Sequence, residues 1–296
     1  MKKAVVFGGA GFLGSHTADV LTKEGYDVTI FDIHESLYLL KNQKMIVGDI
    51  LDKKQVNGVI KGCDYVYNFA GIADIDEASD KPIETVKNNI LGNTIILDSC
   101  RKNNVKRFVF ASTVYVYSQA GSFYRATKQA CETLIEEYNR KYDLSYTILR
   151  YGSLYGPRSP ETNWIHKIIT EALTTKKITR NGDGEEIREY IHVVDASELS
   201  VKILSEEYKN RIITITGNRS MRIKDLHMMV KEMLNGSIEL IYLPSVSNTH
   251  YEITPYSFSP KISKKLVSNE YYDLGQGILE CLSEVKKELD KKKKEV

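Results

Sequence analysis

A tyrosine and a lysine four residues apart form the part of this sequence best suited to proton transfer. In Tyr124-Arg-Ala-Thr-Lys128 the two side chains share one face of the helix that the surrounding pattern predicts. A phenol has a pKa of about 10 and is a poor base at neutral pH. A neighbouring ammonium favours the phenolate and lowers that pKa. The pair could therefore take a proton from a substrate hydroxyl while a hydride leaves the same carbon.

The position of this pair gives it weight, because the same spacing arises by chance in a chain with 19 tyrosines. The pair follows the predicted strand Arg107–Ala111, which runs into Ser112 and Thr113. Thr113 thus brings a hydroxyl to the carboxyl end of a parallel strand, where doubly wound folds hold their ligands.

A glycine-rich turn near the N-terminus has the spacing of a dinucleotide-binding loop. Gly8, Gly11 and Gly14 lie between a predicted strand and a predicted helix, a context that is stronger evidence than the glycines alone. Gly8 allows a sharp turn, Gly11 lets the backbone approach a pyrophosphate, and Gly14 lets the helix pack closely on the strand. The backbone N–H groups at the helix start, around Phe12 and Leu13, would then face the phosphates.

An aspartate at the end of the second predicted strand discriminates between nicotinamide cofactors. Asp32 lies eighteen residues beyond Gly14. A carboxylate there can accept hydrogen bonds from both ribose hydroxyls of NAD and repels the 2′-phosphate of NADP. The next residues, Ile33-His34-Glu35, include no arginine to bind that phosphate. We therefore expect NAD as the cofactor; the alternative is that Asp32 only caps a turn, a common role for aspartate.

Alternating apolar runs and amphipathic stretches predict the fold that must hold these groups. Each apolar run is short and continuous, as in a parallel sheet with helices on both faces. Strand and helix in repetition predict an α/β protein with a Rossmann-type, doubly wound parallel sheet. The predicted strands are Ala4–Phe7, Val28–Phe31, Met45–Val47, Tyr65–Phe69, Arg107–Ala111 and Tyr146–Leu149, and the predicted helices include Leu13–Glu24, Ile83–Lys102 and Tyr124–Lys141.

The regular alternation ends near residue 150, where a loop-rich stretch with several Gly and Pro residues begins. We expect an NAD-binding Rossmann domain over residues 1–155 and 190–208, with Ile191–Leu204 returning to the large sheet. A smaller C-terminal α/β substrate lobe is expected over residues 156–189 and 209–296. Its lysine-rich end, Lys286–Val296, is typical of a solvated helix end.

Composition and charge exclude several classes of protein. Lys plus Arg number 41 against 39 Asp plus Glu, a net charge of +2, whereas dedicated nucleic-acid binders are usually more basic. No apolar run reaches the roughly eighteen residues of a membrane helix, and the chain begins with a strand rather than a signal peptide. Four cysteines without a C-x-x-C pair predict reduced core thiols, no metal site and a cytoplasmic protein: Cys63, Cys100, Cys131 and Cys281.

Together these motifs resemble the extended short-chain dehydrogenase/reductase family, and within it the NAD-dependent nucleotide-sugar epimerase/dehydratase branch. The glycine loop, continuing as Gly14-Ser15-His16-Thr17, is similar to that of UDP-galactose 4-epimerases. Other matching segments follow in the family's order over the first 200 or so residues: Val47-Gly48-Asp49-Ile50, Asn68-Phe69-Ala70-Gly71, Asn89-Ile90-Leu91-Gly92, Leu149-Arg150-Tyr151-Gly152, Tyr155-Gly156-Pro157, Gly182-Asp183-Gly184-Glu185 and the run from Arg188 to Asp195.

The resemblance implies further cofactor-binding residues. Asp49 and Ile50 would lie by the adenine, and Ala70 and Gly71 would line the cofactor path. Asn89 would steady that loop.

The resemblance also implies residues that act on the substrate. Thr113 would stand beside it with Tyr124 as the base, while Lys128 would also contact the nicotinamide ribose. Ser153 and Arg188 would bind the substrate, Arg188 through a phosphate that suits its planar guanidinium. The alternative for Arg188 is a surface ion pair with Glu185 or Glu189.

Three features depart from the family's pattern. Only ten residues separate Thr113 from Tyr124, and so short a loop predicts a more open site. The 4,6-dehydratases place an Asp-Glu pair, and the uronate decarboxylases a Glu, where this chain has Val114 and Tyr115. Epimerases of the branch bind phosphate through an arginine in the C-terminal lobe. No arginine follows Arg222 here, which leaves Lys261 or Lys264 as candidate substitutes.

These observations favour an NAD-dependent nucleotide-sugar epimerase. The Tyr124–Lys128 pair would remove a proton from a sugar hydroxyl as hydride passes to NAD. The keto sugar would then turn within the site and take the hydride back on its other face. The main alternative is an NAD(P)H-dependent keto-sugar reductase or dehydrogenase, and a third is a non-catalytic NAD-binding scaffold. The resemblance also implies a homodimer formed by the helices Ile83–Lys102 and Tyr124–Lys141.

Overall fold

The computed structural model describes residues 1–218, 220–244 and 252. The chain divides into two units, Met1–Ser259 and Pro260–Val296, and every described residue belongs to the first. Lys261, Lys264, Cys281 and the tail Lys286–Val296 therefore lie outside the described residues.

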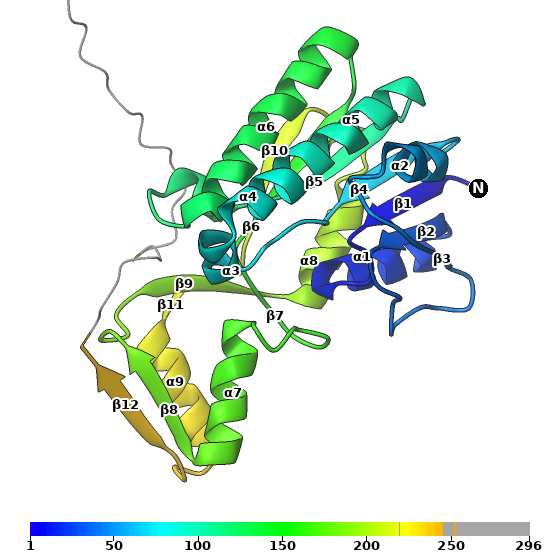
Figure 1. The fold of residues 1–296 in the computed structure, drawn as a ribbon. Helices are drawn as coiled ribbons and strands as arrows, with labels where there is room; N and C mark the ends of the chain where they lie inside the picture. The colour runs from blue at the N-terminus through cyan, green and yellow to red at the C-terminus, as the bar shows by residue number, and fades with distance from the viewer. Residues whose placement is uncertain (219, 245–251, 253–296) are drawn as a thin grey trace, which may run out of the picture. The chain divides into compact units, whose positions relative to one another are not determined.

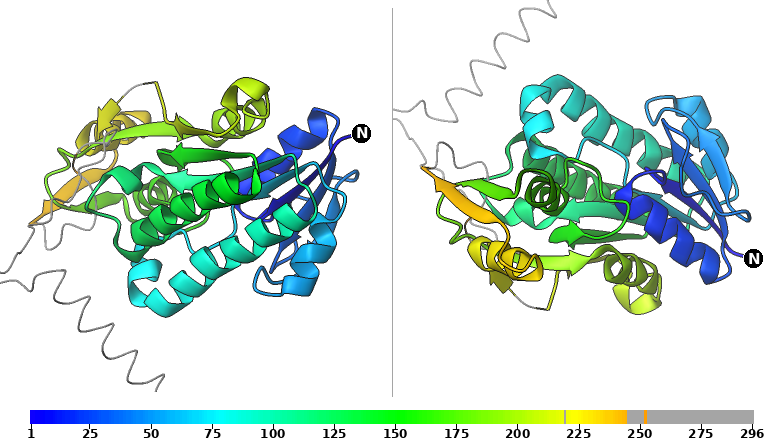
Figure 2. Two further views of the ribbon diagram at one scale, coloured as in Figure 1. Left: turned by 90° about the horizontal axis from the view of Figure 1, so that it is seen from above. Right: turned by 90° about the horizontal axis from the view of Figure 1, so that it is seen from below.

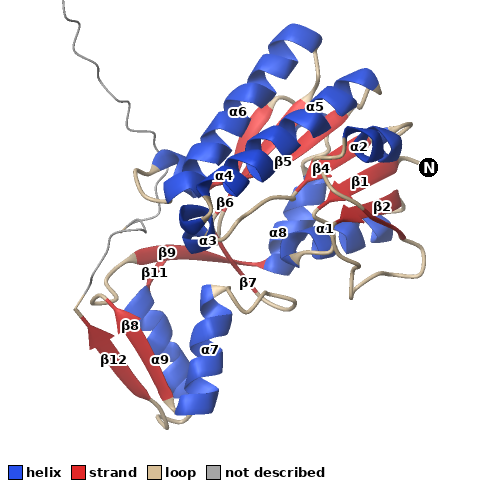
Figure 3. Cartoon of the chain, in the orientation of Figure 1, coloured by secondary structure: helices blue, strands red, loops and turns tan. Residues whose placement is uncertain are grey.

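A seven-stranded parallel sheet forms the centre of the first unit (Figures 1 and 3). Its strand order is β10-β6-β5-β4-β1-β2-β3, and the direction in which successive strands are added reverses between β1 and β4. The doubly wound, Rossmann-type sheet is thereby confirmed. The strands are β1 (Lys3–Phe7), β2 (Asp27–Asp32), β3 (Lys44–Val47), β4 (Tyr65–Asn68), β5 (Arg107–Thr113), β6 (Tyr146–Tyr151) and β10 (Arg211–Ile215).

Helices cover both faces of this sheet because its strands are apolar on both sides (Figure 2). On β1, Val5 and Phe7 belong to one core, and Ala4 and Val6 belong to the other, as the two-residue period of a strand requires. The returning segment 191–204 is largely a helix that packs beside α1. The first core packs against α2 (Lys53–Ile60), α5 (Asn93–Lys102) and α6 (Ser122–Tyr142), and the second against α1 (Phe12–Lys23) and α8 (Val193–Lys202).

The helix expected over 83–102 is divided into several parts. After α3 (Ile75–Asp80), the chain forms α4 (Pro82–Thr85), the π-helical segment η1 (Val86–Gly92) and then α5. A π-helical turn changes which side chains face a given direction and is frequent near functional sites. Here η1 carries Asn88, which lines the pocket described below, and Asn89, which is hydrogen-bonded to the lining residue Ile72.

Two small sheets complete the first unit. β7 (Ser153–Tyr155), β9 (Ile187–His192) and β11 (Ser220–Arg222) form one of them. The other pairs β8 (Lys177–Asn181) with β12 (Glu239–Leu243). Buried residues at 168, 172 and 178 pack the second sheet against its helices. The remaining elements are α7 (Trp164–Thr175), α9 (Ile223–Met233) and two 3-10 turns, η2 (Val114–Tyr117) and η3 (Glu206–Tyr208).

One segment lies in a different sheet from the one expected. Residues 209–215 were placed in the C-terminal lobe, but β10 pairs in parallel with β6 at the edge of the large sheet. Its Ile213 and Ile215 pack into the same core as the buried residues of α8. Burial of these side chains stabilises the strand at the edge of the large sheet.

Three cysteines lie in the described part of the chain, and all three are free thiols. Cys100 and Cys131 are buried free thiols, and Cys63 is a half-buried one. Within these residues, no helix is long and apolar enough to cross a membrane. The same residues contain no cluster of three or more His, Cys, Asp or Glu side chains placed to hold a metal ion.

Candidate active site

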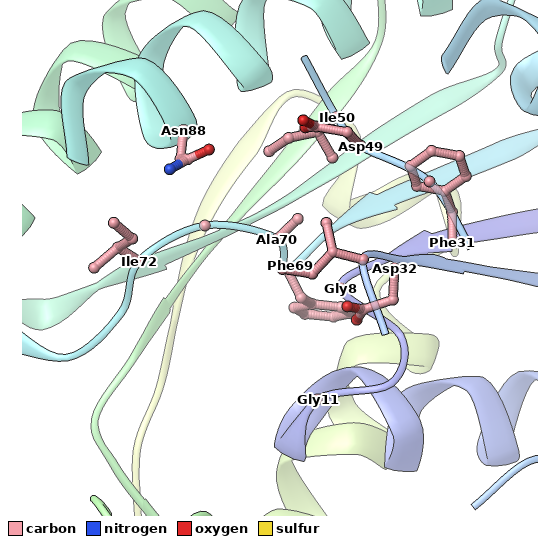
Figure 4. Close-up of a pocket in the computed structure, with 13 residues that line it drawn as sticks. Gly8, Gly11, Phe31, Asp32, Asp49, Ile50, Phe69, Ala70, Ile72 and Asn88 are labelled. Carbon is pink, nitrogen blue, oxygen red and sulfur yellow. The ribbon is translucent and has the colours of Figure 1, made fainter. Parts of the chain in front are cut away.

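A cavity of about 280 Å³ opens at the carboxyl ends of β1, β2 and β4 (Figure 4). Parallel sheets of this kind bind ligands at this edge, where the strand order reverses. Seven of the predicted cofactor residues line the cavity: Gly8, Gly11, Asp32, Asp49, Ile50, Ala70 and Gly71. The sequence analysis gave no cofactor role to the others, although it quoted Gly48 and Phe69 within matching segments: Phe31, Ile33, Gly48, Phe69, Ile72 and Asn88.

The glycines of the first turn leave no room for side chains. Gly8 has a φ of +73°, and a Cβ there would lie 2.6 Å from the backbone nitrogen of Ala70. A Cβ on Gly14 would lie 2.1 Å from the carbonyl oxygen of Gly8. Gly11 caps α1 without any side-chain hydrogen bond to the first N–H groups, those of Phe12 and Leu13 among them. The turn can therefore present bare N–H groups to an anion.

Asp32 ends β2 at the rim of this cavity. Its Oδ2 accepts a hydrogen bond from the backbone of Ala10 at 3.0 Å, which fixes the carboxylate beside the glycine turn. Asp49, on the other side of the cavity in Figure 4, accepts one from the backbone of Leu51 at 2.8 Å. A glycine turn, an uncapped helix start and a fixed carboxylate together fit a dinucleotide with its pyrophosphate and ribose.

Asn89 joins the cavity to the helix that carries the tyrosine. Its Oδ1 accepts from the backbone N–H of Ile72 at 2.8 Å, and its Nδ2 donates to the carbonyl of Ile72 at 3.0 Å. The same Nδ2 lies 3.0 Å from Oγ1 of Thr127 on α6. Asn68, which the sequence analysis quoted without a role, accepts from the backbone N–H of Ala70 at 3.1 Å. These amides fix the loop that follows β4.

Thr113, Tyr124 and Lys128 meet at the carboxyl end of β5. Thr113 is the last residue of that strand, and the other two lie in the first turns of α6. Thr113 is hydrogen-bonded to the phenol of Tyr124. Nζ of Lys128 donates to the carbonyl of Ala111 at 2.7 Å and lies 5.7 Å from the centroid of the Tyr124 ring.

The pKa values at this site differ from the simple expectation. Burial raises the pKa of Tyr124 to about 12, and the hydrogen bond from Thr113 opposes that rise. Burial also lowers the pKa of Lys128 to about 8. We expected the lysine to lower the pKa of the phenol, but here desolvation outweighs any such effect. The ammonium is directed to Ala111 rather than to the phenolic oxygen.

A buried ion pair lies behind these residues, and the sequence analysis missed it. Glu132 follows Lys128 by one helical turn and binds Arg150 of β6 through both carboxylate oxygens, at 3.0 and 2.5 Å. Glu132 also accepts a hydrogen bond from the hydroxyl of Ser112, the neighbour of Thr113. Arg150 in turn lies 4.4 Å from the ring centroid of Tyr117 in the short loop. Two features of the sequence could have indicated this ion pair. One is a carboxylate one helical turn beyond Lys128, and the other is an arginine within a predicted strand of the large sheet.

Two of the three predicted substrate residues, Ser153 and Arg188, lie on the small three-stranded sheet, and the third is Thr113. Ser153 begins β7 and is half-buried, and its register partner is Tyr190 of β9. Arg188 of β9 is only 6% exposed. Its Nη1 donates to the carbonyls of Ile187 and Glu252 at 3.0 and 3.3 Å. Burial of this kind differs from the exposed surface ion pair that was the alternative for Arg188.

The fold and the site define a Rossmann-type dinucleotide-binding protein with a tyrosine–lysine pair beside its cofactor cavity. The sequence profile of the NAD dependent epimerase/dehydratase family matches residues 4–216. A UDP-N-acetyl-alpha-D-glucosaminuronate decarboxylase of Bacillus cytotoxicus is 30% identical over 82% of this chain and 84% of that protein. The chain belongs to the NAD-dependent epimerase/dehydratase family.

Other similar proteins include epimerases. A putative UDP-glucose 4-epimerase of Methanocaldococcus jannaschii is 29% identical over 80% of this chain and 84% of its own length. The UDP-N-acetylglucosamine 4-epimerase of Methanobrevibacter ruminantium, solved with UDP-N-acetylmuramic acid, has a TM-score of 0.79 at 27% identity over 87% of this chain and 90% of that one. The UDP-glucuronic acid 4-epimerase of Bacillus cereus, solved with UDP-glucuronic acid and NAD, has a TM-score of 0.79 at 27% identity over 88% and 95%. The expected family, an NAD-dependent enzyme and NAD as cofactor are confirmed.

Proposed function

We propose that this protein is an NAD-dependent nucleotide-sugar epimerase that acts by reversible hydride transfer through a keto-sugar intermediate. The observation that carries the proposal is the meeting of Thr113, Tyr124 and the buried Lys128 at the carboxyl end of β5, next to the dinucleotide cavity. The similar proteins named as UDP-sugar epimerases support UDP-sugars as the substrate class to test first.

In this proposal each side chain at the end of β5 has one task. Tyr124 takes the proton of the sugar hydroxyl, and Thr113 donates a hydrogen bond that favours the phenolate. Lys128 contacts the nicotinamide ribose, while Ser153 and Arg188 hold the substrate. A bound NAD would supply the reversible hydride transfer. The residues proposed to hold NAD are Gly8, Gly11, Phe12, Leu13, Gly14, Asp32, Asp49, Ile50, Ala70, Gly71, Asn89, Tyr124 and Lys128.

The residues after Thr113 favour epimerisation over dehydration or decarboxylation. Those reactions need a further acid or base, and Val114 and Tyr115 provide no carboxyl group. The carboxylate of Glu132 is engaged by Arg150 and Ser112, so it is not free for proton transfer. The lack of a free carboxyl group at these positions weighs against decarboxylation, the activity for which the 30% identical relative is named.

The test begins with the purified protein. We expect it to carry NAD through purification and to interconvert UDP-sugar epimers without net formation of NADH. Tyr124→Phe should keep the bound NAD but lose roughly a thousandfold or more in kcat, because the base is gone. The matched control is Tyr138→Phe, which alters a half-buried tyrosine on the same helix and should leave kcat unchanged.

Other outcomes would replace the proposal. Net consumption of NADH or NADPH with a keto sugar would establish the reductase. Carbon dioxide release from a UDP-uronic acid would establish a decarboxylase. A protein with no affinity for any nicotinamide cofactor would overturn the catalytic proposal altogether, and full cellular function of Tyr124→Phe would favour the scaffold.

We further propose a homodimer, formed through α4–η1–α5 and α6. Apolar side chains on these helices face outward in the isolated chain: Ile83 is 78% exposed, Leu91 46% and Phe123 44%. Large exposed apolar side chains of this kind fit a surface that a partner covers. The cysteine usage of the sequence supports a cytoplasmic location as part of the same proposal.

A further inference from the structure

The loop that follows β7 contacts elements on the outer side of the dinucleotide cavity. Nη2 of Arg158 lies 2.8 Å from Oδ2 of Asp19 on α1. The guanidinium also stacks on Tyr38, 4.5 Å from its ring centroid. Next to it, the carbonyl of Pro157 is 3.0 Å from Nε2 of His16. The side chains of Arg158 and Asp19 are 22% and 23% exposed, so solvent screens this pair less than an open surface pair.

The second carboxylate oxygen of Asp19 binds the loop that follows β2. Oδ1 accepts a hydrogen bond from Nε2 of Gln43 at 3.0 Å. Gln43 is buried, and its Oε1 accepts from the backbone N–H of Leu40 at 2.9 Å. One carboxylate thus joins three segments: α1, the loop 33–43 and the loop 156–160.

The loop 33–43 needs such contacts to keep a fixed shape. It begins directly after Asp32, and both Asp32 and Ile33 line the dinucleotide cavity. Most of its residues are exposed, with Leu37 at 90%. A loop with so little buried surface opens easily. The contact between Tyr38 and Arg158 and the hydrogen bond from Gln43 to Asp19 are therefore important for holding this loop in place.

We infer that the loop 156–160 is a strap that retains NAD, with Arg158 as its positioning residue. The inference rests on the proposed function, because an epimerase must return the hydride to the same sugar and so must keep the reduced cofactor bound until it has done so. By holding Asp19 and Tyr38 together, Arg158 fixes the cavity wall that begins at Asp32. Release of NAD requires that wall to open, so the contacts of Arg158 slow dissociation rather than take part in the chemistry.

Arginine suits this position better than lysine. A guanidinium can form an ion pair in its plane while its face stacks on an aromatic ring. An ammonium could keep the charge contact with Asp19 but would lose the planar stack on Tyr38. Arg158→Lys should therefore have an intermediate effect.

The experiment measures NAD release from the full-length, NAD-loaded protein after mixing with excess NADH, whose fluorescence reports the exchange. We expect release to be about tenfold faster in Arg158→Ala, because the loop 33–43 loses a tertiary contact and so opens more often. Asp19→Asn should also release NAD faster than the wild type, and Arg158→Lys should fall between wild type and Arg158→Ala.

The chain offers a matched control in Arg101. This arginine also pairs with an aspartate, Asp98, at 2.8 Å and also stacks on a tyrosine, Tyr142, at 4.7 Å. It lies on α5, outside the strap and the cavity lining, so Arg101→Ala should release NAD at the wild-type rate. Thermal unfolding of the NAD-free variants shows whether each is folded, and Asp19→Asn and Arg158→Lys provide the test if Arg158→Ala is not.

The outcomes separate this inference from the proposed function. Wild-type release rates in the folded Arg158 and Asp19 variants would overturn the strap and leave the epimerase intact. Equal acceleration in Arg101→Ala would overturn it too, because the effect would then be general. Absence of NAD binding in the wild type would instead overturn the proposed function.

Discussion

At the scale of single residues, the hydroxyl of Thr113 should set the pH at which the tyrosine works. Burial raises the pKa of Tyr124 to about 12 and the hydrogen bond from Thr113 lowers it. Removal of that bond raises the pKa, so at any lower pH a smaller fraction of the phenol is ionised. Each unit of pKa costs about tenfold in phenolate. We expect Thr113→Val to move the alkaline rise of kcat/KM to higher pH and to lower the rate at neutral pH by about tenfold or more.

The control for this prediction is Thr113→Ser, which keeps the hydroxyl and should keep the wild-type profile. The measurement is kcat/KM across the neutral and alkaline range for the three proteins. A profile for Thr113→Val that superimposes on the wild type would show that this hydroxyl does not tune the base.

Sequence reasoning at this scale predicted which groups meet but not their electrostatics. The spacing of Tyr124 and Lys128 predicted a shared helix face, and the strand before them predicted the approach of Thr113. Burial lowers the pKa of Lys128, although its ammonium donates to the carbonyl of Ala111 and lies over the ring of Phe110, two contacts that favour the charged form. Such desolvation depends on contacts between strands and helices that no local pattern encodes.

At the scale of elements, the ion pair between Glu132 and Arg150 should connect α6 to β6. The two side chains are only 9% and 14% exposed. Removal of one charge leaves the other largely buried without its partner, which typically costs about 3 kcal/mol. We therefore expect Glu132→Gln to lower the free energy of unfolding by about that amount, as measured by urea titration at neutral pH.

A second pair on the same helix provides the comparison. Glu137 pairs with Arg140, and both side chains are more than half exposed. Exposed pairs contribute about 0–1 kcal/mol, so Glu137→Gln should change stability little. Similar losses in both variants would mean that helix propensity, rather than the buried pair, accounts for the effect.

The elements show where local patterns are sufficient. The first six strands were predicted to within a few residues, because each is an apolar run between turn signals. The π-helical segment η1 was missed, since its apolar spacing is close to that of an ordinary helix. β10 was misplaced for another reason: Arg211–Ile215 is a plausible strand anywhere, and its pairing with β6 is set by contacts more than sixty residues away in sequence.

At the scale of the whole molecule, the proposed dimer explains why the outer face of the helices near the site is apolar. Ile83 on α4 is 78% exposed and Phe123 on α6 is 44% exposed, although α4 and α6 pack against each other within one chain. In a two-fold symmetric dimer each of these surfaces meets its equivalent. Since α6 also carries Tyr124 and Lys128, dimerisation would stabilise the helix that holds the base.

The proposed dimer can be tested by placing a charge on this face. Ile83→Glu puts two carboxylates near the interface by symmetry, and an unpaired buried charge costs several kcal/mol, so the dissociation constant should rise by about a hundredfold or more. Sedimentation velocity over a range of concentrations measures the change. Leu173→Glu, at a 54% exposed position on α7 away from these helices, should leave the dimer intact. A wild-type protein that sediments as a monomer at every concentration would refute the dimer, and equal dissociation of both variants would place the interface elsewhere.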